Sequence, residues 1–171
     1  MSEAQFAPEI DIDITLRPAT PDDADVMARL VSELAAYQDQ AARVTAKPAD
    51  FRKNGFGPDR QFDCIIAERD GAPVGLAIFY PFYSTWDAGR GLFIHDLIVD
   101  ESVRGTGVGI KLVSEVARSA KERGCNHLQL NVVHANPARN FYDRFGFTHR
   151  DDLLSYRLIG KRFDRLADGD I

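Results

Sequence analysis

Apolar and polar residues alternate near the start of the chain, where Ile10, Ile12 and Ile14 are separated by Asp11 and Asp13. A period of two is typical of a half-buried strand, and we expect this strand to continue to about residue 17. A helical period follows, opened by the N-cap and first-turn residues Thr20-Pro21-Asp22-Asp23. The expected buried stripe of this helix is Val26, Leu30 and Leu34, flanked by Met27 and Val31.

Three further strands are predicted from short apolar runs, at residues 62–68, 74–80 and 92–99. The first two are joined through Asp70-Gly71, a dipeptide that favours a tight hairpin turn. An aromatic, glycine-bearing stretch leads into the third. Residues 37–60 lack a clear period, and we interpret them as a partly helical segment that is either a connector or a substrate loop.

A long amphipathic helix is predicted over residues 110–123, because apolar residues recur there at helical spacing and Gly124 follows as a stop. Alternation then predicts a short strand. The remaining predicted elements are that strand at 128–132, a helix from Asn136-Pro137 to Gly146, a closing strand pair at 147–150 and 155–159, and a polar surface tail at 160–171.

The order of these elements predicts a mixed α/β (α+β) fold, with a mixed sheet and helices on both faces. Because strands and helices do not alternate regularly, a doubly wound dinucleotide fold is disfavoured. At 171 residues the chain is expected to form a single domain over 1–171, with residues 1–9 and 160–171 as tails.

Composition narrows the choice of partners. No apolar run approaches the length of a membrane span, and the polar N-terminus does not resemble a secretory signal, so we expect a cytoplasmic protein without a membrane partner. The net charge of −5 disfavours a nucleic-acid partner. Cys64 and Cys125 lack metal-ligand spacing and are interpreted as free thiols, and His127 and His134 are predicted to face opposite sides of a strand. No metal is expected.

The stretch after the 92–99 strand is a turn with three glycines that opens a helix, and helix N-termini bind phosphate groups through free N–H groups. A Walker A loop is excluded because Ile110 separates Gly109 from Lys111. The Rossmann fingerprint is excluded as well, since neither possible third glycine position holds glycine. The run instead fits Arg-x-x-Gly-x-Gly, with Arg104, Gly107 and Gly109.

That motif resembles the acyl-CoA pyrophosphate loop of the GNAT superfamily of N-acetyltransferases, and the resemblance extends over about residues 12–159. Other segments are similar to the diamine (spermidine/spermine-type) acetyltransferase branch. They are Glu33-Leu34-Ala35-Ala36-Tyr37, Phe56-Gly57-Pro58, Pro73-Val74-Gly75, Phe79-Tyr80, Tyr83-Ser84-Thr85-Trp86, and Asn136-Pro137-Ala138-Arg139-Asn140-Phe141-Tyr142 followed by Gly146-Phe147. The resemblance implies the GNAT acyl-CoA N-acyltransferase fold, a central mixed sheet with a splayed strand pair.

By this resemblance the co-substrate is acetyl-CoA, and its pantetheine arm pairs with a strand edge. The residues implied in binding coenzyme A are Leu97, Ile98, Val99, Arg104, Gly105, Thr106, Gly107, Val108, Gly109, Asn136 and Tyr142. Tyr142 is implied to protonate the leaving thiolate, although a packing role is an alternative. A backbone N–H near Leu97 is implied to stabilise the oxyanion.

The chain departs from the diamine branch at His95-Asp96, where that branch usually carries Glu-Asp. We hypothesise that His95 is the general base or part of its water relay, while Asp96 attracts the ammonium group or orients His95. A strand histidine that merely pairs with a neighbour is an equal alternative. A second departure is His134-Ala135, where the branch often has an acidic residue and a tryptophan.

The function implied is therefore acetyl transfer from acetyl-CoA to a primary amine of a small molecule, such as a polyamine or an amino-acid side chain. Two alternatives stay open, namely a non-catalytic acyl-CoA-binding regulatory module and a protein N-acetyltransferase. A homodimer is expected by resemblance only.

Overall fold

The computed structural model describes residues 13–169 of the 171-residue chain. The chain divides into two compact units, Met1–Asn131 and Val132–Ile171, and each is described by itself. The predicted alternation at Ile10 and Ile12, and the expected tail over residues 1–9, lie outside the described residues.

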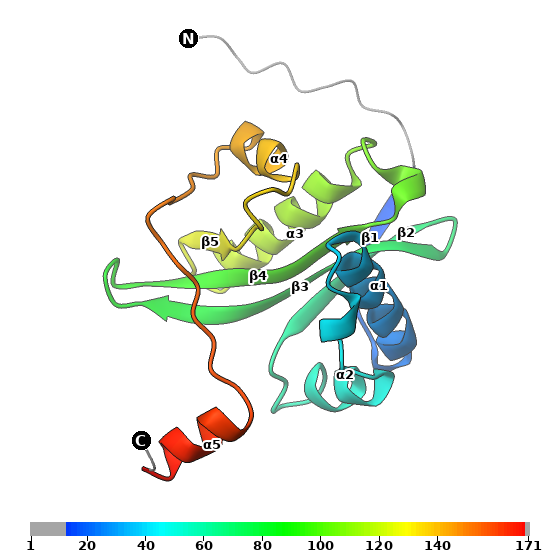
Figure 1. The fold of residues 1–171 in the computed structure, drawn as a ribbon. Coiled ribbons are helices and arrows are strands. Elements are labelled where there is room, and N and C mark those ends of the chain that lie inside the picture. The colour runs from blue at the N-terminus through cyan, green and yellow to red at the C-terminus, as the bar shows by residue number, and fades with distance from the viewer. Residues whose placement is uncertain (1–12, 170–171) are drawn as a thin grey trace, which may run out of the picture. The chain divides into compact units, whose positions relative to one another are not determined.

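A five-stranded sheet forms the centre of the first unit (Figure 1). Its strands follow one another in space in chain order, β1 to β4 antiparallel and β5 parallel to β4. The mixed sheet predicted from the sequence is confirmed. The strands are β1 Ile14–Pro18, β2 Asp63–Arg69, β3 Ala72–Ser84, β4 Gly89–Val99 and β5 His127–Leu130.

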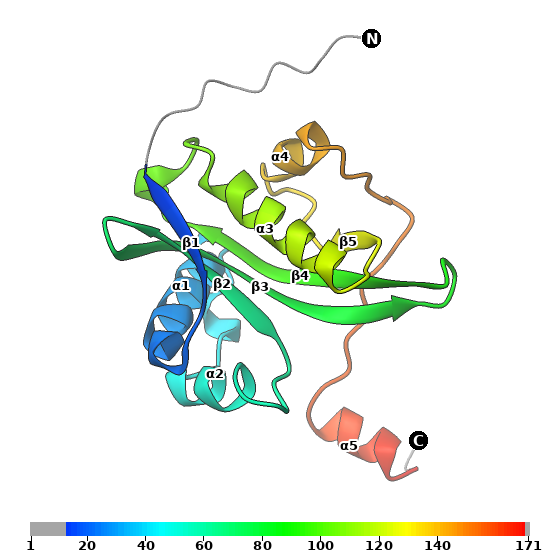
Figure 2. The ribbon, with the colours of Figure 1, turned by 180° about the vertical axis from the view of Figure 1, so that it is seen from behind.

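Helices cover both faces of this sheet, as predicted. The helices α1 and α2 lie on one face, and α3 lies on the other (Figures 1 and 2). Short 3-10 turns join these elements. The bounds are η1 Pro21–Asp23, α1 Ala24–Tyr37, η2 Ala41–Arg43, α2 Pro48–Asn54, η3 Glu101–Val103 and α3 Val108–Glu122.

The start of α1 follows the predicted capping signal. The backbone N–H of Thr20 donates to Asp23 Oδ2 at 2.7 Å, and the turn around Pro21 forms the 3-10 segment that leads into the helix. The buried stripe is shifted from the prediction. Leu30 is fully buried, but its fully buried companions are Ala24 and Met27. Val26, Val31 and Leu34 are partly buried and pack against the core.

Two hairpins join β2, β3 and β4. Asp70 and Gly71 have φ values of 53° and 75°, which confirms the predicted tight turn. The second hairpin was not predicted: both of its strands are longer than expected, since β3 continues to Ser84 and β4 begins at Gly89. Most of the aromatic stretch 81–91 is therefore strand, stabilised by cross-strand ring pairs such as Tyr80 with Phe93.

The core between the sheet and the helices α1 and α2 is aliphatic with one aromatic ring. Its buried members come from both helices and from β2, β3 and β4. They are Ala24, Met27, Leu30, Phe51, Cys64, Ile66, Leu76, Ile78 and Ile98. On the other face, α3 buries Leu112, Val116 and Ala120, which confirms the predicted stripe.

The second unit contains the helices α4 Arg139–Arg144 and α5 Lys161–Ala167. Gly146, with φ of 82°, ends the turn after α4 as predicted. The predicted strand pair at 147–150 and 155–159 is wrong: neither segment is a strand, although both lie within the described residues. Residues 148–159 are all exposed, and Phe147 just before them is partly buried. No neighbouring strand satisfies their backbone groups, so apolar alternation alone does not make them a sheet. The described part of the predicted tail forms α5.

Candidate active site

The strand β4 carries an irregularity where the candidate catalytic residues lie. Ile78 of β3 is opposite Asp96, but the next residue, Phe79, is opposite Ile94. His95 is therefore the extra residue of a β-bulge. In a regular strand, adjacent side chains point to opposite faces. The bulge breaks that alternation, and His95 Nδ1 lies 2.9 Å from Asp96 Oδ2. Both side chains thus reach the same face of the sheet.

That face is the one covered further along by α1. Asp96 is the register partner of Ile78, and Ile78 belongs to the core beneath α1 and α2. The side chain of Asp96 is 18% exposed, whereas that of His95 is 61% exposed. The pair therefore places a carboxylate close to the core and an imidazole toward the solvent. It can supply a negative charge and a proton acceptor at one point.

The edge of β4 beyond the bulge has no strand beside it in the described chain on the β5 side. β5 pairs with β4 only along residues 91–94 and ends at Leu130. Residues 97–99 of β4 pair with β3 on their other side alone. This is the splayed strand pair that the resemblance implied. It leaves an edge along Leu97, Ile98 and Val99 beside which an extended amide-bearing ligand could pair, although the Val99 carbonyl already accepts a hydrogen bond from Arg104 Nε.

The glycine turn follows directly after this edge. Gly105 and Gly107 have φ values of 78° and 89°, a region that favours glycine. Gly107 is the N-cap of α3, and the hydroxyl of Thr106 donates to the carbonyl of Val103 at 2.6 Å. Gly109 already lies within the helix. Strand, turn and helix N-terminus thus form a site where free N–H groups and the helix dipole attract an anion.

Arg104 is held at this turn by two contacts. Its Nε donates to the carbonyl of Val99 at 3.0 Å, and its guanidinium carbon lies 4.7 Å from the centroid of the Tyr37 ring. Tyr37 is the last residue of α1. The contact between Tyr37 and Arg104 was not predicted, because no local sequence pattern links the end of one helix to a loop more than sixty residues away.

A row of rings continues from His95 along the same face of the sheet. Centroid separations are 6.2 Å between His95 and Tyr80, 5.2 Å between Tyr80 and Phe93, 6.5 Å between Phe93 and Phe82, and 5.0 Å between Phe82 and His127. We call these five residues the ring row. The ring row was not predicted from the sequence as a binding surface. Tyr80 and Phe82 are two residues apart on one strand, and this spacing is the signal that places them on the same face.

Asn136 and Tyr142 belong to the second unit. Asn136 Oδ1 accepts a hydrogen bond from the N–H of Ala138 at 2.9 Å. Helix α4 begins at Arg139, so Ala138 and not Asn136 is its N-cap. The Tyr142 ring is 5.1 Å from Phe141 and 5.5 Å from Phe147, centroid to centroid. Burial among these rings raises the pKa of Tyr142 to about 12. Its hydroxyl therefore stays protonated at neutral pH.

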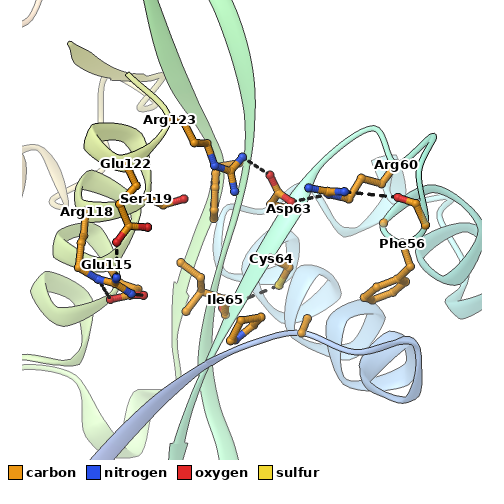
Figure 3. A pocket seen from close by; sticks show the side chains of 15 residues that line it. Phe56, Arg60, Asp63, Cys64, Ile65, Glu115, Arg118, Ser119, Glu122 and Arg123 are labelled. Atoms are coloured by element: carbon orange, nitrogen blue, oxygen red, sulfur yellow. Dashed lines mark hydrogen bonds and ion pairs between the residues drawn. The ribbon is translucent and has the colours of Figure 1, made fainter. Parts of the chain in front are cut away.

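A cavity of about 350 Å³ lies elsewhere in the first unit, beside the C-terminal half of α3 (Figure 3). It contains none of the predicted site residues. Asp63 in its wall accepts hydrogen bonds from Arg123 at 2.5 Å and Arg60 at 2.6 Å. Burial works to raise the pKa of Asp63, but these two hydrogen bonds outweigh it and hold the pKa below its usual range. Burial also raises the pKa of the Cys64 thiol in the same wall.

The charged groups of this cavity pair with one another: Arg60 and Arg123 with Asp63, and Arg118 with Glu115 and Glu122. Within residues 13–169, no cluster of three or more His, Cys, Asp or Glu side chains is placed to hold a metal ion. None of the described helices has the length and apolar character needed to span a bilayer.

A mixed sheet with a bulged, splayed central strand, followed by a glycine turn and a helix, defines the class of acyl-CoA N-acyltransferases of the GNAT fold. A family model described as "Acetyltransferase (GNAT) family" matches residues 28–147, and the chain belongs to that family. Membership of this family, together with the relatives described next, identifies the protein as an N-acetyltransferase.

Among its relatives, thialysine N-epsilon-acetyltransferase of Mus musculus is 32% identical over 164 residues, which cover 89% of this chain and 96% of the relative. Spermidine/spermine N(1)-acetyltransferase-like protein 1 of Homo sapiens is 30% identical over 158 residues, covering 88% of this chain and 22% of the relative. A solved aminoglycoside acetyltransferase from an uncultured soil metagenomic sample aligns with a TM-score of 0.73 at 18% identity. That alignment covers 90% of this chain and 100% of that one, and supports the fold.

Proposed function

We propose that this protein transfers the acetyl group of acetyl-CoA to a primary amine of a small molecule, by direct attack of the amine on the thioester. The observation that carries the proposal is the arrangement along β4. One strand carries the His95–Asp96 pair on its face, an open backbone edge directly after it, and a glycine turn at its end. A base, a pantetheine-binding edge and a phosphate-binding turn thus follow in order.

In the proposed complex, coenzyme A is bound through two kinds of backbone group. The amides of pantetheine pair with the free edge at Leu97, Ile98 and Val99. The pyrophosphate is bound by N–H groups of Gly105, Thr106, Gly107, Val108 and Gly109, and Arg104 adds positive charge. Support comes from the positive φ values of Gly105 and Gly107, which turn successive N–H groups toward one region.

The chemistry needs a neutral amine, and an alkylamine near pKa 10 is mostly protonated at neutral pH. We assign His95, directly or through a water, to remove that proton, and Asp96 to attract the ammonium and orient the imidazole. The amine nitrogen then forms a bond to the thioester carbonyl carbon. The oxyanion that results is stabilised by the backbone N–H of Leu97, the carbon–sulfur bond breaks, and the nitrogen releases its second proton to solvent as the amide forms.

Tyr142 is assigned to protonate the leaving thiolate. The support is that its hydroxyl keeps its proton at neutral pH and can donate it, although burial raises its pKa to about 12 and makes it a weaker acid than a free tyrosine. Asn136 is assigned to bond the pantetheine. Its Oδ1 already accepts from the N–H of Ala138, which leaves the two N–H groups of its amide and one further lone pair of Oδ1 for that contact.

The acceptor is proposed to be a small molecule because the relatives described above are named for thialysine and for spermidine or spermine. Release of free coenzyme A thiol, measured with a panel of short amines, diamines and amino acids, tests the proposal. Turnover with any small amine supports it. Binding of acetyl-CoA without turnover of any amine would favour a regulatory module, and turnover only with peptides would favour a protein acetyltransferase. The cytoplasmic location and the homodimer stay predictions.

A further inference from the structure

The ring row continues the covered face of the sheet beyond the helices that cover it. Tyr80 and Phe82 follow Ile78 at strand spacing, and Ile78 is the last β3 residue in the core under α1 and α2. Phe93 is the register partner of Tyr80. In Figure 1 the β3–β4 hairpin extends past α1 and α2. Tyr80, Phe82 and Phe93 are only partly buried, so within the first unit they form an apolar strip without a helix over it.

Charge is distributed unevenly along this strip. Asp96 lies at one end, opposite Ile78. Between that position and the end of the hairpin, residues 79–84 of β3, 89–95 of β4 and all of β5 contain neither Asp nor Glu. A ligand that extends from Asp96 along the ring row therefore meets aromatic carbon after its first charged group. Along these strand residues a second ammonium group on that ligand gains no carboxylate to offset the loss of its water. The turn beyond them holds Asp87, which is exposed and already accepts a hydrogen bond from Ser84 Oγ at 2.6 Å.

We propose that the ring row binds the body of the acceptor, and that the preferred acceptor is a monoamine with an extended apolar or aromatic body rather than a polyamine. This inference rests on the proposed function, because it takes the His95–Asp96 pair as the point where the amine reacts. The body runs from Asp96 across Tyr80 and Phe93 to Phe82. Four strand residues separate the level of Asp96 from that of Phe82, a length of about 13 Å.

Matched amines test the inference directly. Octylamine and 1,8-diaminooctane have the same carbon chain and differ by one terminal ammonium, and propylamine is too short to reach Phe82. We expect kcat/KM for octylamine to exceed that for 1,8-diaminooctane by about tenfold or more. We also expect octylamine to exceed propylamine, since each buried methylene contributes roughly fourfold in affinity.

Variants of the far end of the strip provide the structural control. Phe82→Ala is expected to raise KM for octylamine by about tenfold while leaving propylamine kinetics unchanged. Phe82→Leu, which keeps an apolar side chain, should have a smaller effect and guards against misfolding. Tyr83→Ala is the matched control, because Tyr83 is the next residue of β3, points to the opposite face and is 59% exposed. Tyr83→Ala should change neither kcat nor KM for octylamine or propylamine.

The outcomes separate the two proposals. Equal or better use of 1,8-diaminooctane, or an equal loss of propylamine and octylamine turnover in Phe82→Ala, would overturn the inference while leaving acetyl transfer intact. Failure of every amine, propylamine included, would instead count against the proposed function. If no amine is turned over, calorimetric titration of octylamine into the wild type and into Phe82→Ala, without acetyl-CoA, still tests whether the ring row binds the body of the amine. Equal affinity of the two proteins for octylamine would reject such binding.

Discussion

The guanidinium carbon of Arg104 lies 4.7 Å from the centroid of the Tyr37 ring, while Nε of the same arginine donates to the carbonyl of Val99. These contacts join the C-terminal end of α1 to the glycine turn and to the last residue of β4. A guanidinium held on an aromatic face keeps its charge but loses rotational freedom. Tyr37 therefore presets the position of the proposed phosphate-binding charge.

Removal of the Tyr37 ring should weaken acetyl-CoA binding. A cation–π contact at an exposed site contributes about 0.5–1 kcal/mol, so Tyr37→Ala is expected to raise the Kd for acetyl-CoA roughly two- to fivefold, with kcat little changed. Tyr37→Phe keeps the ring face and should behave as the wild type. Isothermal titration measures both. Acetyl-pantetheine, which lacks the pyrophosphate, is the control ligand, and an equal loss of its binding would show that Tyr37 does not act through Arg104.

The glycine turn allows a folding role to be separated from a ligand role. Gly107 has a φ of 89°, whereas Gly109 lies inside α3. Gly107→Ala should lower the free energy of unfolding by about 1 kcal/mol and weaken acetyl-CoA binding. Gly109→Ala should weaken binding because its methyl group occupies the proposed pyrophosphate site, while stability is kept or raised. Urea denaturation and acetyl-CoA titration test the pair; unchanged binding in Gly109→Ala would contradict the proposed cradle.

Substitution of Tyr142 should affect chemistry more than binding. Tyr142→Phe removes the proton donor and keeps the ring between Phe141 and Phe147, so kcat is expected to fall about 100-fold or more with little change in KM for acetyl-CoA. Because burial raises the pKa of Tyr142 to about 12, no loss of activity from its ionisation is expected below about pH 11. Steady-state rates measure both effects.

The matched control for this variant is Tyr156→Phe. Tyr156 lies in the same unit and is 88% exposed, so loss of its hydroxyl should leave the rate unchanged. Retention of more than half of kcat by Tyr142→Phe would assign Tyr142 a packing role, the alternative that its contacts with Phe141 and Phe147 also allow.

The sequence predicted the sheet class, the hairpin at Asp70-Gly71 and the glycine turn because each depends on local chemistry. Period-two alternation, the Asp70-Gly71 dipeptide and the capping box at Thr20 act within a few residues. The family resemblance proposes β4 as the functional strand. The candidate site residues on β4 and in the turn could therefore be proposed from the sequence alone, and their roles stay predictions.

Features that depend on contacts between distant segments were not predictable in this way. Strict alternation would place His95 and Asp96 on opposite faces, and only the pairing of β4 with β3 reveals the bulge that brings them together. The contact of Tyr37 with Arg104 likewise arises from tertiary packing. The false strand pair at 147–150 and 155–159 shows the converse, since strand-like composition cannot supply a hydrogen-bonded neighbour.

The role proposed for His95 as general base can be tested by substitution. His95→Ala is expected to reduce kcat/KM for a short amine about 100-fold at neutral pH and to displace the acidic limb of the pH–rate profile. His149→Ala, at an exposed histidine of the second unit, is the control. If His95→Ala loses rate with an unchanged pH profile, His95 is a structural residue of the bulge and another group or a water accepts the proton.

A prediction about stability concerns Asp23, which is buried at the start of α1 and only 9% exposed in its side chain. A two-point hydrogen bond from Arg17 lowers the pKa of this carboxyl to about 2; burial opposes the change, and Thr20 adds two further donors. The same arginine also pairs with Glu68 of β2 at 2.7 Å. Asp23 therefore connects the helix start to two strands of the sheet.

The sign of the pH dependence follows from the lowered pKa. An aspartate with a pKa near 3.9 in the unfolded chain and about 2 in the folded one stabilises the fold above about pH 4. That contribution is lost as pH falls from 4 to 2. Asp23→Asn should lower the free energy of unfolding by about 2 kcal/mol at pH 7, with a smaller difference at pH 3. Urea titrations at the two pH values measure it. Asp22→Asn, one residue earlier and exposed, removes the same charge from the helix N-terminus without the Arg17 contacts. An equal loss in both variants would attribute the effect to the helix dipole and not to the pairing with Arg17.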